Sequence, residues 1–226
     1  MLIPGFISLR RKKMARIEAA IFDLDGTLIP RNSTEKIIVR HFVKNLSFSL
    51  SGILLYLLES ARYKDFKSSK AYYHGIKYFT FLNVINKYFS GVPLNEWISE
   101  KAIHEIERHR EAGRKLILLT GAPEEAATRF GKVLKFDLVV SAKIKVVNGV
   151  ITGKTEGPHP YGKKKREILI KLSEYHNIDL NNSYGYGDSF ADRFFLNIVG
   201  NPVAVNPDKK LKRYAVHKGW KIVYWF

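Results

Sequence analysis

Residues 17–27 read IEAAIFDLDGT. The run is mostly apolar, as in a strand that is buried on both faces, and it ends in two aspartates, Asp23 and Asp25, followed by Gly26. In an extended backbone the side chains of residues i and i+2 lie on the same face, so the two carboxylates point the same way. Like charges this close repel unless a cation or a shared proton relieves them, which allows one ionised and one protonated carboxyl group. The stretch predicts a β-strand that carries two acids into a functional site.

Two later runs that we expect to form strands also end in small or polar residues. One is KLILL at residues 115–119, and the other is a short run at residues 183–186. Ligands of open α/β sheets bind at the carboxyl ends of the strands, so we expect the residues that follow the three runs to share one crevice. Each of these side chains, taken alone, is also compatible with an ordinary turn or helix cap, and the functional interpretation depends on the whole set. The set is Asp23, Asp25, Thr120, Gly121, Asp188, Ser189 and Asp192.

The rest of the chain alternates short β-rich runs with amphipathic stretches. This alternation is typical of the α/β class, with a Rossmann-like, doubly wound and mostly parallel sheet. Asn148-Gly149, between two apolar runs, predicts a hairpin with a type I′ turn. Further strands are expected at residues 138–141, 202–205 and 221–224. Helices are expected at residues 97–112, 124–134 and 163–176.

The segment between the first two apolar runs is helical in pattern and rich in aromatic residues, with no clear strand. Asn32 is a candidate N-cap at its start, and Glu35 three residues later completes a pattern like a capping box. The segment is long enough to form a helical domain of its own. We therefore expect a basic N-terminal tail at residues 1–16, an α/β core at residues 17–31 and 93–226, and a helical cap at residues 32–92.

The charge of the chain is strongly positive, with 38 lysines and arginines against 21 acidic residues among 226. This excess is compatible with a solvated basic surface, or with attraction to phosphorylated substrates or an anionic membrane surface. Nucleic acid as a partner is not favoured, because no zinc finger, RNP motif or basic zipper accompanies the charge. The absence of cysteine excludes a thiol nucleophile and fits a reducing cytoplasm. No apolar run reaches the roughly 18 residues of a spanning helix. We expect a cytoplasmic protein, with peripheral binding to the inner face of the membrane as the alternative.

The clusters together resemble the motifs of the haloacid dehalogenase superfamily. These motifs are DLDGT and LLTG, each after a strand, a lysine ahead of a helix, and GDSFAD after another strand. The resemblance runs from about residue 17 to residue 225, and the insertion looks like a helical cap of the C1 type. Residues 184–220 are similar to subfamily IB, the subgroup that contains phosphoserine phosphatase.

The resemblance implies a magnesium-dependent phosphatase that hydrolyses phosphomonoesters through an aspartyl-phosphate. Asp23 would be the nucleophile, and Asp25 would protonate the leaving alkoxide and later activate water. The implied Mg²⁺ ligands are the carboxylates of Asp23 and Asp188 and the backbone carbonyl of Asp25. Hard oxygen ligands and the absence of cysteine favour this metal over zinc. Asp192 and Ser189 would support the centre by orienting a neighbouring group.

The resemblance also implies a set of phosphate-binding groups. Thr120 would donate its hydroxyl to the phosphoryl oxygens, together with the backbone N–H of Gly121. A lysine would neutralise the charge between the nucleophile and the phosphate. Three successive lysines, at residues 163–165, compete for this role. The family pattern places the lysine four residues before a core leucine, and Lys165 stands four residues before Leu169.

The substrate is the least determined part of the interpretation. A small, phosphoserine-like metabolite is the first expectation, although Asn32 occupies the position where phosphoserine phosphatases carry a glutamate. The second is a phospholipid head group at a membrane surface, because LLTGAP resembles phosphatases of phosphatidylglycerophosphate and the expected cap is rich in leucine and aromatic residues. The third is a non-enzymatic anion-binding domain, which the intact set of acids argues against. The oligomeric state stays open.

Overall fold

The computed structural model describes residues 16–30, 33–45, 50–63, 70–90 and 93–226. At its centre is a six-stranded, fully parallel sheet in the order β3-β2-β1-β6-β7-β8. From β1 the chain winds outward through β2 and β3, then returns to the other side of β1 and winds outward through β6, β7 and β8. The sheet is therefore doubly wound, as the alternating pattern predicts. The strands are β1 (Ala19–Phe22), β2 (Lys115–Pro123), β3 (Leu138–Ala142), β6 (Tyr184–Gly187), β7 (Asn201–Val205) and β8 (Lys221–Val223).

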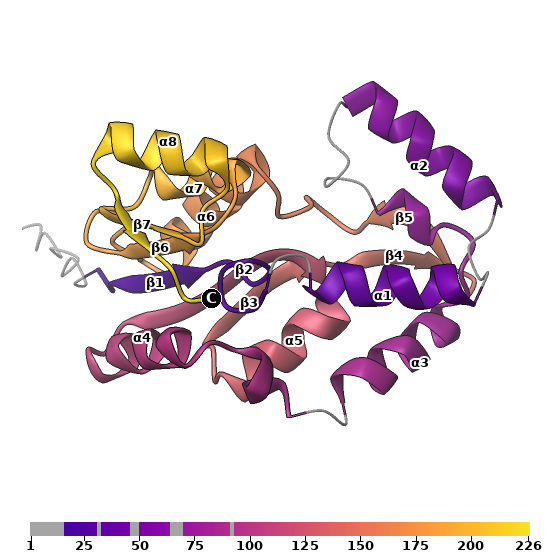
Figure 1. Cartoon of the computed structure of the whole chain (residues 1–226), viewed down its shortest axis with the longest axis horizontal. Coiled ribbons are helices and arrows are strands. Elements are labelled where there is room, and N and C mark those ends of the chain that lie inside the picture. The colour runs from indigo at the N-terminus through magenta and orange to yellow at the C-terminus, as the bar shows by residue number, and fades with distance from the viewer. Residues whose placement is uncertain (1–15, 31–32, 46–49, 64–69, 91–92) are drawn as a thin grey trace, which may run out of the picture.

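Helices cover both faces of the sheet (Figure 1). The alternation of side chains along β1 shows why both faces are apolar: Ala20 and Phe22 belong to one buried cluster, and Ala19 and Ile21 belong to the other. The first cluster includes residues of α4 (Glu100–Glu111) and α5 (Glu124–Val133). The second includes residues of α6 (Lys163–Tyr175), α7 (Arg193–Leu196) and α8 (Lys209–Lys218).

A group of helices projects from one end of the sheet (Figure 1), and we call its described part, between residues 33 and 90, the helical cap. It contains α1 (Ser33–Lys44), α2 (Leu50–Tyr63), η1 (Ala71–Tyr73) and α3 (Tyr78–Phe89), and η2 (Leu94–Trp97) leads back to α4. Phe42, Tyr73 and Phe81 pack edge to face in its interior. Phe89 meets Phe130 of α5, with ring centroids 6.2 Å apart, and so joins the cap to the core. The expected domain boundaries stay predictions. Residues 1–15 of the expected tail at residues 1–16, and the candidate helix N-cap Asn32, lie outside the described residues.

The hairpin of β4 (Ile144–Val147) and β5 (Val150–Thr155) is separate from the main sheet. Its turn has positive φ at both Asn148 (49°) and Gly149 (74°), which confirms the predicted type I′ geometry. The hairpin pairs with residues 75–78 of the helical cap, because Gly75 N–H donates to the Ile151 carbonyl and Tyr78 N–H donates to the Gly149 carbonyl. A segment from the second half of the chain therefore packs against the cap.

None of the helices in the described part of the chain has both the length and the apolar character needed to cross a membrane.

Tyr186 of β6 offers a test of the core. Its buried ring stacks on Phe22, while its hydroxyl donates to Glu105 and lies 2.7 Å from Nε2 of the buried His109. Tyr186→Phe removes the hydrogen bonds of this hydroxyl to Glu105 and to the buried His109, so we expect the free energy of unfolding to fall by about 1–3 kcal/mol. Urea unfolding measures the change, and Tyr175→Phe, at an exposed site, is the matched control. Equal effects of the two substitutions would contradict the role of the hydroxyl.

Candidate active site

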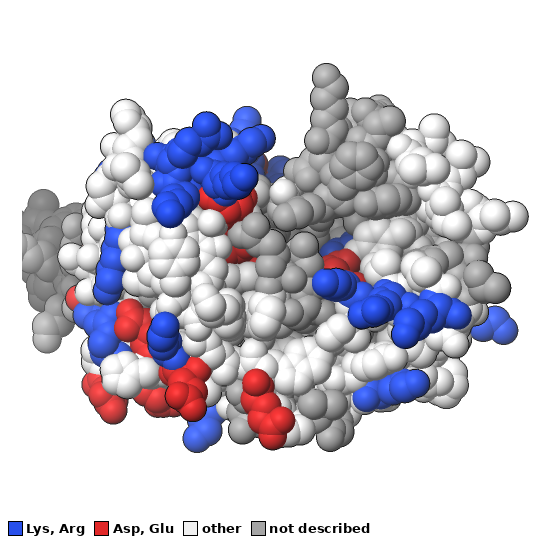
Figure 2. Space-filling model, in the orientation of Figure 1, with Lys and Arg blue, Asp and Glu red and all other residues white. Residues whose placement is uncertain are grey.

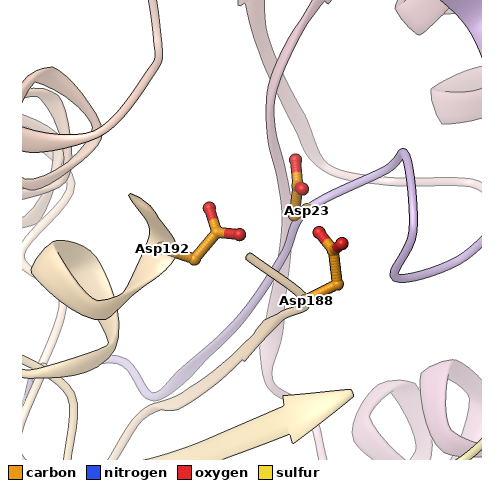
Figure 3. Close-up of side chains that lie close together, drawn as sticks. All are labelled: Asp23, Asp188 and Asp192. Carbon is orange, nitrogen blue, oxygen red and sulfur yellow. The ribbon is translucent and has the colours of Figure 1, made fainter. Parts of the chain in front are cut away.

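The expected acids meet where the winding of the sheet reverses, between β1 and β6. Asp23 directly follows β1, and Asp188 directly follows β6. Asp192 ends the short 3₁₀ helix η3 (Phe190–Asp192). Figure 3 shows the three carboxylates pointing toward one space, and one oxygen of each lies within 4.8 Å of the others. All three residues are buried. Doubly wound sheets bind their ligands at this reversal.

Lys165 is the cation of this site. It lies in the first turn of α6, is buried, and places its Nζ 2.8 Å from Asp23 Oδ1 and 2.8 Å from Asp192 Oδ1. Burial alone lowers the pKa of Lys165, but the charges of Asp192 and Asp23 outweigh burial, so its pKa lies above its ordinary value. Of the other two candidates, Lys164 pairs with Glu167 and Lys163 lies over the Phe194 ring, and both are exposed. Among the three lysines, Lys165 alone contacts Asp23 in the described structure.

Asp23 and Asp192 both contact Lys165, but their pKa values shift in opposite directions. Burial raises the pKa of Asp23 to about 6, although Lys165 opposes this rise. Burial by itself would also raise the pKa of Asp192, but Lys165 and the hydrogen bonds from Ser189 hold this pKa below its usual value. Ser189 donates its N–H and its hydroxyl to Asp192 Oδ2, at 3.0 and 2.7 Å. Both oxygens of Asp192 are thus occupied, so this residue positions Lys165 and the loop after β6.

Gly26 brings the backbone of the DLDGT loop against Asp188. Its φ is +89°, and a Cβ built on it would lie 2.4 Å from Asp188 Oδ2. Only glycine satisfies both the positive φ and this close approach. Asn206 donates its side-chain N–H to the Gly26 carbonyl at 3.2 Å, which holds the loop in place. The glycine therefore sets the distance between the loop and the carboxylate of Asp188.

Asp25 does not join the other three carboxylates. Its side chain accepts from the N–H of Thr34, at 2.9 Å, and from the Thr34 hydroxyl. Thr34 is the second residue of α1, so Asp25 satisfies one of the unpaired N–H groups at the start of that helix. Burial raises the pKa of Asp25 to about 6, against the lowering effect of these hydrogen bonds. A carboxyl group with such a pKa can hold or release a proton near neutral pH.

Thr120 and Gly121 lie in the last part of β2. Thr120 is buried, and its Oγ1 accepts from the N–H of Ala122 at 3.1 Å, so its own proton is left to donate. Gly121 faces His159, because a Cβ on Gly121 would lie 3.3 Å from Cε1 of the imidazole ring. His159 was not predicted as a site residue, because it belongs to none of the motifs in the sequence. It precedes Lys165 by six residues.

Comparison with known proteins agrees with this geometry. The family model of the haloacid dehalogenase-like hydrolases matches residues 20–196. The chain belongs to this family. The resemblance seen in the sequence motifs, the fold and the expectation of a hydrolase are thereby confirmed.

Several relatives of this haloacid dehalogenase-like hydrolase are known. A protein of Streptomyces azureus named "Inhibition of morphological differentiation protein" is 29% identical over 91% of this chain and 77% of its own length. A Mycobacterium tuberculosis protein named "Phosphoserine phosphatase SerB1" is 24% identical over 90% of this chain and 70% of its own. Among solved structures, a phospho-aspartyl intermediate analogue of phosphoserine phosphatase has a TM-score of 0.65 at 20% identity, covering 94% of this chain and 95% of that one. The structural likeness shows a shared fold.

The hydrolase also has polar groups near Asp25 whose contacts with one another were not predicted from the sequence. Glu35 of α1 forms an ion pair with the buried Lys70 just before η1. Both are close enough to Asp25 to act on its pKa, Glu35 raising it and Lys70 lowering it. Tyr73 is fully buried, and burial and then the charges of Glu35 and Glu125 hold its pKa well above the usual value. Glu35, Lys70 and Tyr73 all belong to the helical cap, which therefore brings these groups close to Asp25.

The donor set of the hydrolase fits a hard divalent cation. The cluster of Asp23, Asp188 and Asp192 offers carboxylate oxygens only, which suit Mg²⁺ better than metals that prefer nitrogen or sulfur. Both oxygens of Asp192 are held, one by Lys165 and the other by Ser189, so Asp23 and Asp188 are the better candidates to supply carboxylate ligands to a cation. The close approach of Gly26 to Asp188 forms one wall of this space.

Proposed function

We propose that this chain is a magnesium-dependent phosphatase that hydrolyses phosphomonoesters through a phosphoryl group transferred to Asp23. The observation that carries the proposal is the contact of Asp23 with Lys165 beside Asp188, at the reversal of the sheet. The nucleophile of such a reaction must be an ionised carboxylate, and Lys165 favours that form. The solved phospho-aspartyl analogue named above, a protein with the same fold, supports this chemistry.

In the first step, an oxygen of Asp23 attacks phosphorus, and the bond between phosphorus and the leaving alkoxide breaks. Asp25, whose pKa is raised to about 6, gives its proton to the leaving oxygen. In the second step, Asp25 takes a proton from water, the resulting hydroxide attacks phosphorus, and Asp23 is released with inorganic phosphate. Lys165, the Thr120 hydroxyl and the Gly121 N–H stabilise the charge on the phosphoryl oxygens.

The carboxylates of Asp23 and Asp188 and the backbone carbonyl of Asp25 would hold the Mg²⁺ ion. The ion would neutralise charge on the phosphoryl group as it is transferred. Asp192 and Ser189 act through Lys165, which they hold against Asp23.

The substrate that we propose first is a small phosphorylated metabolite of the phosphoserine type, acted on in the cytoplasm. The names of the relatives support this class, and the Glu35–Lys70 pair offers one charge of each sign near Asp25. A phospholipid head group such as that of phosphatidylglycerophosphate is the second candidate, and the exposed leucines of α2 favour it.

Phosphate release from a panel of substrates tests the proposal. We expect activity with Mg²⁺, its loss to background in excess EDTA, and its recovery when Mg²⁺ is added in excess over the chelator, because without the divalent charge the carboxylates of Asp23 and Asp188 repel the anionic phosphoryl group. The panel contains phosphoserine, other phosphorylated metabolites and phosphatidylglycerophosphate in detergent. Full activity in EDTA would contradict the metal site. A folded protein with no activity on any phosphomonoester would support the anion-binding alternative instead.

A further inference from the structure

The outer side of α2 is an apolar stripe that faces solvent. Five large aliphatic residues follow the i, i+3, i+4, i+7, i+8 spacing that normally turns one face of a helix toward a core. Their side chains are 44–87% exposed. Gly52, off the stripe, is buried, and α2 packs against η1 while it projects from the rest of the molecule (Figure 1). The stripe, which we call the α2 leucine stripe, consists of Leu50, Ile53, Leu54, Leu57 and Leu58.

A row of cations lies on α1, another helix of the cap. Lys36, Arg40 and Lys44 are spaced four residues apart on α1, and all three are exposed. Figure 2 shows a row of Lys and Arg over α1, on the same face of the molecule from which α2 projects. Among the described residues, none of the three forms an ion pair with a carboxylate. The cap therefore presents an aliphatic stripe on α2 and a positively charged row on α1, which we call the α1 basic row.

We infer that the α2 leucine stripe and the α1 basic row dock the protein on an anionic phospholipid bilayer. A helix of this kind binds in the plane of a membrane interface, with its aliphatic side chains at the boundary of head groups and acyl chains. Anionic head groups attract the lysines and the arginine of the α1 basic row. This inference concerns where the protein binds and is independent of the reaction proposed above.

A second copy of the chain is a poorer occupant of the same surface. Packing α2 against α2 of another copy would bring the two α1 basic rows near one another, in a protein whose net charge is already +17. Like charges oppose that approach, whereas an anionic bilayer neutralises them. Charge complementarity thus selects the membrane surface over self-association.

Co-sedimentation of the full chain with vesicles tests the inference. We expect binding to vesicles of phosphatidylcholine and phosphatidylglycerol, at least about 10-fold weaker binding to pure phosphatidylcholine, and weakening of the anionic binding in high salt. Leu54→Glu with Leu57→Glu should reduce binding to anionic vesicles at least about 10-fold, because two carboxylates enter the α2 leucine stripe. Val216→Glu with Val133→Glu changes two exposed apolar residues of α8 and α5 and is the matched control.

The basic row has its own pair of variants. Replacing Lys36, Arg40 and Lys44 by glutamine should weaken binding to anionic vesicles at least about 10-fold. Replacing three exposed cations of α8, Lys209, Lys212 and Arg213, by glutamine removes the same charge and should weaken binding much less. Circular dichroism verifies that each variant is folded.

Three outcomes would overturn the inference. They are a wild-type protein that does not bind anionic vesicles, control variants that lose as much binding as the test variants, and a dimer in gel filtration that dissociates when Leu54 and Leu57 are replaced while vesicle binding persists. The last outcome would assign the stripe to a second copy. Because hydrolysis of a soluble phosphomonoester is measured separately, failure of the docking inference is distinguishable from failure of the proposed reaction.

Discussion

Asp23→Asn is expected to lower kcat for p-nitrophenyl phosphate by at least about 10³-fold. An amide oxygen is neutral and a poor nucleophile, so the covalent step is lost. The fold should persist, because Asp192 still pairs with Lys165 when the charge of Asp23 is removed. Steady-state kinetics with saturating Mg²⁺ measure the loss, and thermal unfolding measures the fold.

The control for this variant is Asp179→Asn, which makes the same chemical change away from the site. The Asp179 carboxylate accepts hydrogen bonds from Asn181 and Asn182 in its own loop. It should keep near-native kcat. If Asp23→Asn kept more than about a tenth of native activity, Asp23 would not be the nucleophile.

Lys165→Met is expected to impair both catalysis and stability. It leaves Asp23 and Asp192 as neighbouring buried carboxylates without a cation, and breaking a buried ion pair in this way costs about 3–5 kcal/mol of unfolding free energy near neutral pH. We expect kcat to fall by about 10²–10³-fold, since the phosphoryl oxygens lose a positive charge. Urea unfolding in EDTA and kinetics in Mg²⁺ measure the two effects.

The pH dependence of the Lys165→Met defect has a definite sign. Without the lysine, burial and mutual repulsion raise the pKa of both aspartates in the folded state above the unfolded values, so protonation stabilises the folded variant. The deficit relative to wild type should therefore shrink as pH falls from 7.5 to 5. Lys164→Met, at an exposed lysine paired with Glu167, should change stability by less than about 0.5 kcal/mol at either pH. A Lys165→Met deficit that grows on acidification would contradict this account.

Short-range patterns account for what could be predicted from the sequence. Residues 19–22 form a continuous apolar run. Successive side chains of a strand point to opposite faces of the sheet, and both faces are buried here. The Asn148-Gly149 turn depends on two backbone angles that these residue types prefer. The choice of Lys165 used its spacing from Leu169, and residues four apart share one side of a helix, which here is the buried side.

Features that join distant segments could not be predicted in this way. The Glu35–Lys70 ion pair links residues far apart in the chain, and neither residue type is specific to such a pair. The hydrogen bond from Thr34 to Asp25 depends on where α1 begins relative to the DLDGT loop. The sequence shows that the expected cap is rich in leucine, but only the packing shows that the leucines of the α2 leucine stripe face solvent. Each of these depends on three-dimensional context that one sequence does not contain.

The pairing of the β4–β5 hairpin with residues 75–78 restricts how the crevice can open. Backbone hydrogen bonds make the hairpin and the helical cap one mechanical body, so a swing of the cap carries the hairpin with it. At the base of the hairpin, Lys143 and Glu156 form an ion pair. From there, residues 157–162 lead directly into the first turn of α6. A segment of six residues therefore connects the hairpin that packs against the cap to the helix that carries Lys165, the charge beside Asp23.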